Sequence, residues 1–373
     1  MEQYHRVYAS INLENIRHNI REIQNRVGIG VKLMPVIKAD AYGHGAPEVA
    51  AALKNYADAF AVATIEEAMQ IRRCAPSTPI LILGTLSCEN YDKALKYDIT
   101  VALYTYEMAV SLSESAKRFG KNAAAHLALN TGMNRIGMPC TDEGIELAKR
   151  ICSLDNLDVS GIFSHYATAD EADKQYSHLQ LDRFDAFCNR LEADGIKLDT
   201  KHICNSAAII DLPEKKYDMV RPGIITYGLN PSDEINKNVL NLKPALEFKS
   251  HISFIKTLPA GESISYGRTY TTDRECRIAT VPVGYADGYP RSLSNKGRVL
   301  IHGKSAPIVG RVCMDQFMVD ISHIPEACIE DDVTLIGEDN GAFISADEIA
   351  EKAGTINYEI VCGLSKRVPR IYK

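Results

Sequence analysis

Eight short apolar runs, each trailed by helical or polar material, constrain the fold of this chain more than any other feature of its sequence. Continuous apolar strands that alternate with helices are typical of a parallel sheet covered on both faces. Eight such units favour a (β/α)8 barrel, which takes roughly 250 residues. A doubly wound open sheet is the second interpretation. The runs lie at residues 31–38, 59–64, 79–84, 99–104, 123–130, 159–166, 201–206 and 219–228.

From about residue 240 the pattern changes to alternating polar and apolar residues with β-branched side chains and glycine turns, which indicates mainly antiparallel β structure. One helical pattern returns at 345–354. Since 373 residues exceed the size at which one core usually stops growing, we predict an α/β barrel domain over 1–237 and a β-rich domain over 238–373. A strand pattern in the first ten or so residues is consistent with pairing to the second domain.

Charge and cysteine usage narrow the class of protein. The net charge of −6 predicts no basic surface for nucleic acid. No apolar run reaches the roughly 20 residues of a membrane helix, and the N-terminus lacks the apolar segment of a signal peptide. Ten cysteines are scattered without a C-x-x-C pair, which is typical of reduced thiols in a cytoplasmic protein and not of a zinc site.

Reactive side chains gather at the predicted strand ends, which is where barrel enzymes place their active sites. Each residue alone has an ordinary interpretation: Lys38 as a solvated strand end, His165 as a hydrogen-bonded core histidine, Gly223 as a turn. Taken together they form a coherent set of one lysine, two arginines, a histidine and two loops with backbone donors. The set comprises Lys38, Arg135, His165, Asn205–Ser206 and Arg221–Gly223.

This set suits a cofactor that carries both an aldehyde and a phosphate. Burial lowers the pKa of a lysine, and a neutral lysine amine condenses with an aldehyde to a Schiff base. The segments 205–208, NSAA, and 221–224, RPGI, offer a hydroxyl, backbone N–H groups and a glycine near strands seven and eight, the usual phosphate site of a barrel. Pyridoxal 5'-phosphate is the common aldehyde of this kind.

The segment 36–46, VIKADAYGHGA, resembles the cofactor-lysine motif of the alanine racemases, which are pyridoxal-phosphate enzymes of fold type III. The resemblance continues in the family's order through LNTGMNRIGM, HICNSAAI, VRPGIITYGLNPS, ISYGRTYTT, VPVGYADGYPR, VGRVCMDQFMVD and GTINYEIVCGLSKRVPRIY. It implies a homodimeric cytoplasmic isomerase that interconverts L- and D-alanine through a pyridoxal-phosphate aldimine by a two-base mechanism, and supplies D-alanine for peptidoglycan.

The resemblance also implies roles for individual residues. Lys38 matches the lysine that holds the cofactor and serves as one base, and Tyr266 matches the second base, contributed by the partner subunit. Arg221 matches the arginine that faces the pyridine nitrogen, where a group that can only donate hydrogen bonds keeps that nitrogen unprotonated. His165 matches a histidine behind the tyrosine. His202 matches a group behind this first layer of contacts.

Further matches concern the phosphate and the substrate. The remaining cofactor-binding positions are Tyr42, Asn205, Ser206, Gly223, Ile224 and Tyr358. Arg135 and the backbone of Met314 match contacts to the substrate carboxylate, and Tyr285 and Asp315 match the substrate entrance.

One position departs from the family. Many members carry a carbamylated lysine, two residues before an acidic residue, that orients the arginine matched by Arg135. This chain has Ala128 in place of that lysine and Asn130 in place of the acidic residue. Alanine cannot be carbamylated, so we expect Arg135 to be oriented by Asn130, by a water or by a bound anion.

Three alternative functions are open at this point. Serine racemisation uses the same chemistry. The related racemase domains of glycopeptide resistance are attached to membrane segments, which are absent from this sequence. A domain excised from such a longer protein is also compatible with this sequence. Barrel-type pyridoxal-phosphate decarboxylases place a carboxylate where this chain has Arg221. A non-enzymatic pyridoxal-binding barrel would lack residues 240–373 and Tyr266.

Overall fold

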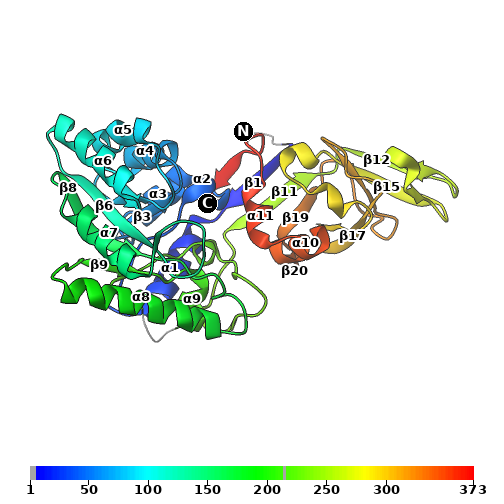
Figure 1. The fold of residues 1–373 in the computed structure, drawn as a ribbon. Helices are drawn as coiled ribbons and strands as arrows, with labels where there is room; N and C mark the ends of the chain where they lie inside the picture. The colour runs from blue at the N-terminus through cyan, green and yellow to red at the C-terminus, as the bar shows by residue number, and fades with distance from the viewer. Residues whose placement is uncertain (1–5, 213–215) are drawn as a thin grey trace. The chain divides into compact units, whose positions relative to one another are not determined.

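The computed structural model describes residues 6–212 and 216–373, which form two compact units (Figure 1). The barrel unit comprises Asn15–Ala41 and Gly45–Lys243. The β unit comprises the described residues up to Glu14, the short segment Tyr42–His44, and Pro244–Lys373.

The barrel unit is built on parallel strands that alternate with helices. One parallel ladder runs in the order β3-β4-β5-β6-β8-β9, with β7 (Met138–Pro139) beside β6, and β10 pairs with β2 in a second ladder. The barrel strands are β2 (Lys32–Leu33), β3 (Phe60–Val62), β4 (Ile80–Ile82), β5 (Thr100–Leu103), β6 (Ala123–Asn130), β8 (Leu157–Phe163), β9 (Thr200–His202) and β10 (Met219–Val220).

Single hydrogen bonds and bridges close the two ladders into a ring. Val36 forms a parallel bridge with Ala61, and the N–H of Ile37 donates to Ala61 at 2.9 Å, which joins β2 to β3. The N–H of Arg221 donates to Cys204 at 2.9 Å, which joins β9 to β10. The predicted (β/α)8 barrel is therefore confirmed, each predicted apolar run contributes a strand, and the open-sheet interpretation is wrong.

The helices begin where the sequence provides caps. In α4 (Ile65–Cys74) the Thr64 side chain and Glu67 form a reciprocal capping box, and α6 (Tyr106–Phe119) ends at Gly120 in the left-handed conformation. The other helices of this unit are α1 (Leu13–Val27, which begins in the β unit), α3 (Ala46–Leu53), α5 (Tyr91–Lys96), α7 (Asp142–Cys152), α8 (Gln175–Ala193) and α9 (Ser206–Asp211). Within the described residues, no helix combines the length and apolar composition that crossing a membrane requires.

The β unit is a mainly antiparallel sheet in the order β12-β15-β18-β17-β16-β19-β11-β1-β21, with β20 beside β19. Its buried aromatic core includes Tyr289 and Phe317, whose rings stack at 5.2 Å. The predicted helix at 345–354 is α10 (Ala346–Ala353), followed by α11 (Asn357–Cys362). The strands are β11 (Leu246–His251), β12 (Phe254–Leu258), β15 (Cys276–Val281), β16 (Arg298–Ile301), β17 (Lys304–Val309), β18 (Phe317–Asp320), β19 (Asp332–Asp339), β20 (Ala342–Ile344) and the separate pair β13 (Ser263–Ile264) and β14 (Tyr270–Thr271).

The two ends of the chain meet in this sheet. Strand β1 (Val7–Ile11) lies between β11, to which it is antiparallel, and β21 (Arg370–Tyr372), to which it is parallel. The N-terminal strand thus belongs to the β unit, and the chain returns to that unit at Pro244.

Candidate active site

Lys38 follows the first barrel strand, two residues after the bridge at Val36, and begins an unusual left-handed turn, α2 (Lys38–Tyr42). Ala39, Asp40, Ala41 and Tyr42 have φ values of 52, 54, 53 and 54°. A non-glycine residue in this conformation costs about 1–2 kcal/mol. Strain of this kind persists only where the surroundings hold it, and it gathers at functional sites.

Two carboxylates hold this turn within the barrel unit. Glu67, at the start of α4, accepts the N–H of Ala39 at 2.7 Å with one oxygen and the N–H of Ala63 at 2.8 Å with the other. Asp40 accepts the N–H of Ala46 at 2.9 Å. The capping residue of α4 therefore also fixes the backbone that carries Lys38.

Arg221 lies buried at the end of β10, with 2% of its surface exposed. Its guanidinium donates to the carbonyls of Ser164 at 2.7 Å, His202 at 2.9 Å and Ile203 at 3.2 Å. These carbonyls follow β8 and end β9, so three strand ends meet at this one side chain.

Arg221 also determines the tautomers of a chain of histidines. It contacts Nδ1 of His202 at 2.9 Å and Nδ1 of His165 at 3.2 Å, and since a guanidinium only donates, both nitrogens must accept. Nε2 of His202 then carries the proton and donates to Nδ1 of His126 at 2.9 Å. Burial and then the charge of Arg221 lower the pKa of His126 to about 4 and of His165 to about 3, and hold the pKa of His202 well below its usual value.

These neutral histidines predict that the protein loses stability in mild acid. In the unfolded chain each binds a proton near pH 6.5, but in the folded chain only at lower pH. Between these values the unfolded state binds more protons, so the free energy of unfolding falls as pH falls below 6.5, by up to about 1.4 kcal/mol per pH unit for each histidine. Urea unfolding at pH 7.5, 6.5 and 5.5 measures this. His126→Gln should reduce the slope, and a stability that stays constant over this range would contradict the assignment.

The predicted phosphate loops lie together. The hydroxyl of Ser206 accepts the N–H of Gly223 at 2.8 Å, so the start of α9 contacts the segment after β10. The Asn205 side chain caps α9 by accepting the N–H of Ala208 at 3.0 Å. Ile224 opens a short 3-10 helix, Ile224–Tyr227, at a position where a helix N–H has no intrahelical partner. A hydroxyl and main-chain donors at this end of the barrel fit a phosphate group, and Lys38 in the same unit fits an aldehyde.

Arg135 lies on the loop that follows β6 and is exposed. The methyl group of Ala128 packs in an apolar cluster with Ala102 and Phe163, so no polar group occupies that place. Asn130 binds loop backbone instead of Arg135, accepting the N–H groups of Gly132 at 3.1 Å and Asn134 at 3.0 Å. Asn130 thus makes no hydrogen bond to the Arg135 guanidinium and holds instead the loop backbone just before it.

The remaining predicted residues lie in the β unit and form two groups. Tyr42 and Tyr358 have ring centroids 6.0 Å apart, and burial raises the pKa of the Tyr42 phenol. Tyr266, Met314 and Asp315 line a cavity of about 420 Å³ together with Ser265, Cys313, Gln316 and Met318. Tyr266 is 71% exposed, so its phenol is presented at the surface of this unit.

Backbone hydrogen bonds bring Tyr285 beside that cavity. The N–H of Tyr285 donates to Cys313 at 3.1 Å, and the N–H of Ala286 donates to Met314 at 3.0 Å. The loop that carries Tyr285 and the loop that carries Met314 are thereby joined.

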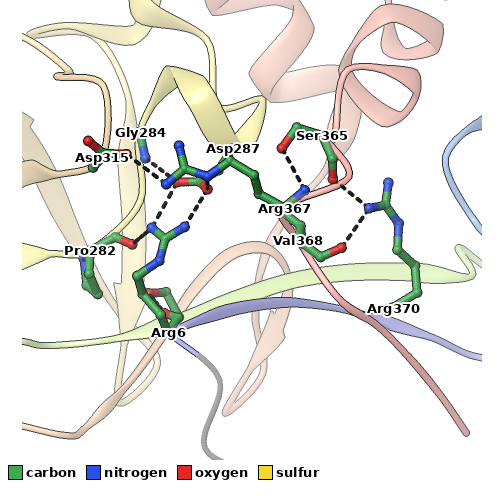
Figure 2. A network of polar contacts seen from close by, with 10 residues as sticks. Arg6, Pro282, Gly284, Asp287, Asp315, Ser365, Arg367, Val368 and Arg370 are labelled. Carbon is green, nitrogen blue, oxygen red and sulfur yellow. Dashed lines mark hydrogen bonds and ion pairs between the residues drawn. The ribbon is translucent and has the colours of Figure 1, made fainter.

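A buried carboxylate, Asp287, anchors this pair of loops (Figure 2). Arg6 binds both of its oxygens, at 3.0 and 2.5 Å, and the N–H of Gly284 donates to it at 3.0 Å. Arg367 lies 3.6 Å from Asp287 and donates to Asp315 at 2.8 Å. The bond to Asp287 raises the pKa of Arg6. Three segments far apart in the chain thus meet at one carboxylate.

Sequence reasoning missed several of these residues. Asp287 lies inside the recognised segment VPVGYADGYPR, but its partner Arg6 is 281 positions away, and no local pattern links them. Glu67 was not singled out. His126 and Gln180, a buried glutamine of α8, carried no signal, because their partners lie in distant segments of the chain.

The barrel-type pyridoxal-phosphate enzymes are the class of protein that this fold and site define. The barrel carries a lysine, an arginine and a phosphate-type loop at its strand ends, and the same chain contains an antiparallel β domain. Residues 11–231 match the family model "Alanine racemase, N-terminal domain", and residues 245–372 match "Alanine racemase, C-terminal domain". The chain belongs to the alanine racemase family, whose members depend on pyridoxal phosphate.

Relatives and solved structures agree over almost the whole chain. The chain is 48% identical over 367 residues to the alanine racemase of Desulforamulus reducens, covering 98% of each protein. It is similar to the structure of the alanine racemase of Clostridium difficile 630, with a TM-score of 0.96, 41% identity, and coverage of 100% of this chain and 97% of that one. The alanine racemase of E. faecalis gives a TM-score of 0.93 at 36% identity over 100% of both chains.

Proposed function

We propose that this alanine racemase interconverts L- and D-alanine, with pyridoxal 5'-phosphate held in the barrel unit and Lys38 and Tyr266 acting as the two bases. The observation that carries the proposal is the placement of Lys38, Arg221 and the contact between Ser206 and Gly223 at strand ends of one barrel. The near full-length match to alanine racemases supports alanine as the substrate.

The residues that would hold the cofactor fit its functional groups. The amine of Lys38 suits the aldehyde. Asn205, Ser206, Gly223 and Ile224 of the barrel unit suit the phosphate. When bound, the cofactor makes the α-proton of the amino acid acidic enough to be removed near neutral pH.

Arg221 sets the electronic character of the site. Burial lowers the pKa of its guanidinium to about 10, so the group stays charged at neutral pH and can only donate. A donor of this kind keeps an opposing pyridine nitrogen unprotonated. This favours simple return of the proton over side reactions, and it disfavours the decarboxylase alternative, which needs a carboxylate at this position.

Racemisation needs one base on each face of the α-carbon. Lys38 would take or return the proton on one face and Tyr266 on the other, with His165 behind the tyrosine. Because Tyr266 is 71% exposed on the β unit, it is available to the site of a second subunit, and we propose a homodimer. Arg135 of one subunit and the backbone of Met314 from the second subunit would bind the carboxylate, and Tyr285 and Asp315, also from the second subunit, would form the entrance.

We further propose that the protein acts in the cytoplasm and supplies D-alanine for peptidoglycan. Incubating the purified protein and cofactor with L-alanine and, separately, L-serine, and following the optical rotation, tests it. We expect rotation to decay to zero with L-alanine and faster than with L-serine. Lys38→Ala, which removes one base, is the control and should leave the rotation constant. No decay of the rotation with either amino acid would refute the proposal. Faster decay with L-serine than with L-alanine would identify serine as the preferred substrate.

A further inference from the structure

One face of helix α8 holds the loop that carries Arg135. Tyr176, Gln180 and Arg183 are spaced four and three residues apart, so they lie on the same side of the helix. All three hydrogen-bond to residues 131 and 132, at the start of that loop.

Gln180 is fully buried and is the central member of this group. Its amide donates to the hydroxyl of Thr131 at 3.1 Å and to the carbonyl of His165 at 3.0 Å. Its carbonyl accepts the N–H of Ala167 at 2.8 Å. One side chain thereby joins two segments. The first follows β6 and leads to Arg135, and the second follows β8 and carries His165.

Thr131 is held from two further sides. Its hydroxyl lies 2.8 Å from that of Ser164, and its carbonyl accepts Arg183 at 2.9 Å. The carbonyl of Ser164 is in turn an acceptor for Arg221. The loop and the buried arginine are therefore connected through one continuous set of hydrogen bonds.

Tyr176 closes over the next residue of the loop. Its hydroxyl donates to the carbonyl of Gly132 at 3.0 Å. Gly132 has a φ of 145°, and a Cβ built there would lie 2.4 Å from that hydroxyl, so only glycine fits beneath the tyrosine.

Arg135 itself depends on this loop for its direction. Across residues 6–212 and 216–373, no carboxylate forms an ion pair with its guanidinium, although its charge helps to lower the pKa of His165. The Asn130 side chain binds the N–H groups of Gly132 and Asn134 and the side chain of Asn134, and it does not bind Arg135. The path of the loop backbone therefore decides where Arg135 points.

We propose that Gln180, assisted by Tyr176, is a positioning residue for Arg135 and controls the binding of the amino acid's carboxylate. The inference rests on the proposed role of Arg135 in substrate binding. Gln180 touches no substrate. It fixes the loop backbone that aims the guanidinium.

Gln180→Met tests this, because methionine fills the same volume without the amide. We expect KM for both L- and D-alanine to rise about tenfold while kcat changes less than about threefold, since only the carboxylate contact is loosened. Tyr176→Phe should raise KM about twofold. Asn189→Met, which also replaces an amide with methionine but at an exposed position of α8, is the matched control and should leave both constants unchanged. A fall in kcat at constant KM in Gln180→Met would overturn the proposal.

A double-mutant cycle with Arg135→Lys separates positioning from a general structural effect. If Gln180 acts through Arg135, adding Gln180→Met to Arg135→Lys should raise KM less than about twofold further, because coupled residues are non-additive. Independent, multiplying effects would overturn the proposal.

Amide hydrogen exchange gives a readout that does not depend on catalysis. The N–H groups of Gly132 and Asn134 donate to the Asn130 side chain, so their exchange reports how often the loop opens. If Gln180 holds the loop, these groups should exchange about tenfold faster in Gln180→Met than in wild type or Asn189→Met. Unchanged exchange would refute positioning of the loop by Gln180, whether or not the wild-type protein racemises alanine. Absence of racemisation with the expected change in exchange would instead refute the proposed function.

Discussion

Replacing Arg221 with glutamine is expected to lower kcat/KM for alanine by roughly 10² to 10³, the usual effect of removing one preorganised electrostatic group from an active site. The same change should lower the free energy of unfolding by about 3 kcal/mol, because a guanidinium that serves three carbonyls and two histidines is replaced by one amide with two donors. Steady-state kinetics and urea unfolding measure the two effects.

The histidines provide a specific signature for this variant. Burial is the largest cause of the lowered pKa of His126, His165 and His202, and the charge of Arg221 is the second, so the charge accounts for part of each shift. Without it their pKa values should rise toward 6.5, so the loss of stability between pH 6.5 and 5.5 should become shallower than in wild type. Arg221→Lys keeps the charge but not the planar set of donors, so it should retain the wild-type slope while losing activity. An Arg221→Gln protein with the wild-type pH slope would contradict the proposed coupling.

Replacing Asp287 with alanine is expected to lower the free energy of unfolding by about 2–3 kcal/mol. The change removes a buried acceptor of charge-assisted hydrogen bonds from Arg6 and leaves the N–H of Gly284 without its partner. Because Gly284 precedes Tyr285, we also expect faster hydrogen exchange at the N–H groups of Tyr285 and Ala286, which bind the loop of Met314.

An exposed ion pair supplies the control for Asp287. Asp273 pairs with Arg274 at 3.0 Å, but both side chains are more than half exposed. Asp273→Ala should therefore change the free energy of unfolding by less than about 0.5 kcal/mol. Arg6→Met should reproduce most of the Asp287→Ala effect, and the double variant should be little worse than either single variant. Equal effects at Asp273 and Asp287 would show that burial of the carboxylate is unimportant.

The barrel was predictable because its strands are local signals. A run such as 79–84 is apolar throughout, and it yields β4 whatever its neighbours are, since a strand buried on both faces needs apolar residues at every position. Strand-end residues such as Lys38 and Arg221 could be chosen for the same reason: parallel strands bring their carboxyl ends to one edge. The roles given to them came from the resemblance to a family and remain proposals.

Other features could not be read from the chain. The left-handed turn at 39–42 contains ordinary residues, and the bonds made by Glu67 and by the side chain of Asp40, which help to hold it, join segments that no local pattern links. The sequence left open whether Asn130, a water or an anion orients Arg135; in the structure the short amide of Asn130 binds the loop backbone next to it and not the guanidinium.

Neighbouring residues were enough to predict the two kinds of architecture, the succession of strands along the chain and the motif around Lys38, because hydrophobic periodicity and strand ends are local properties. Three arrangements became visible only in the folded protein: Arg221 sets the tautomers of three histidines, Asp287 joins Arg6 to Arg367, and Gln180 bonds to the loop of Arg135. Each of these arrangements depends on hydrogen-bond geometry between segments that are distant in the chain, and hydrogen bonds form only where folding brings donor and acceptor within about 3 Å.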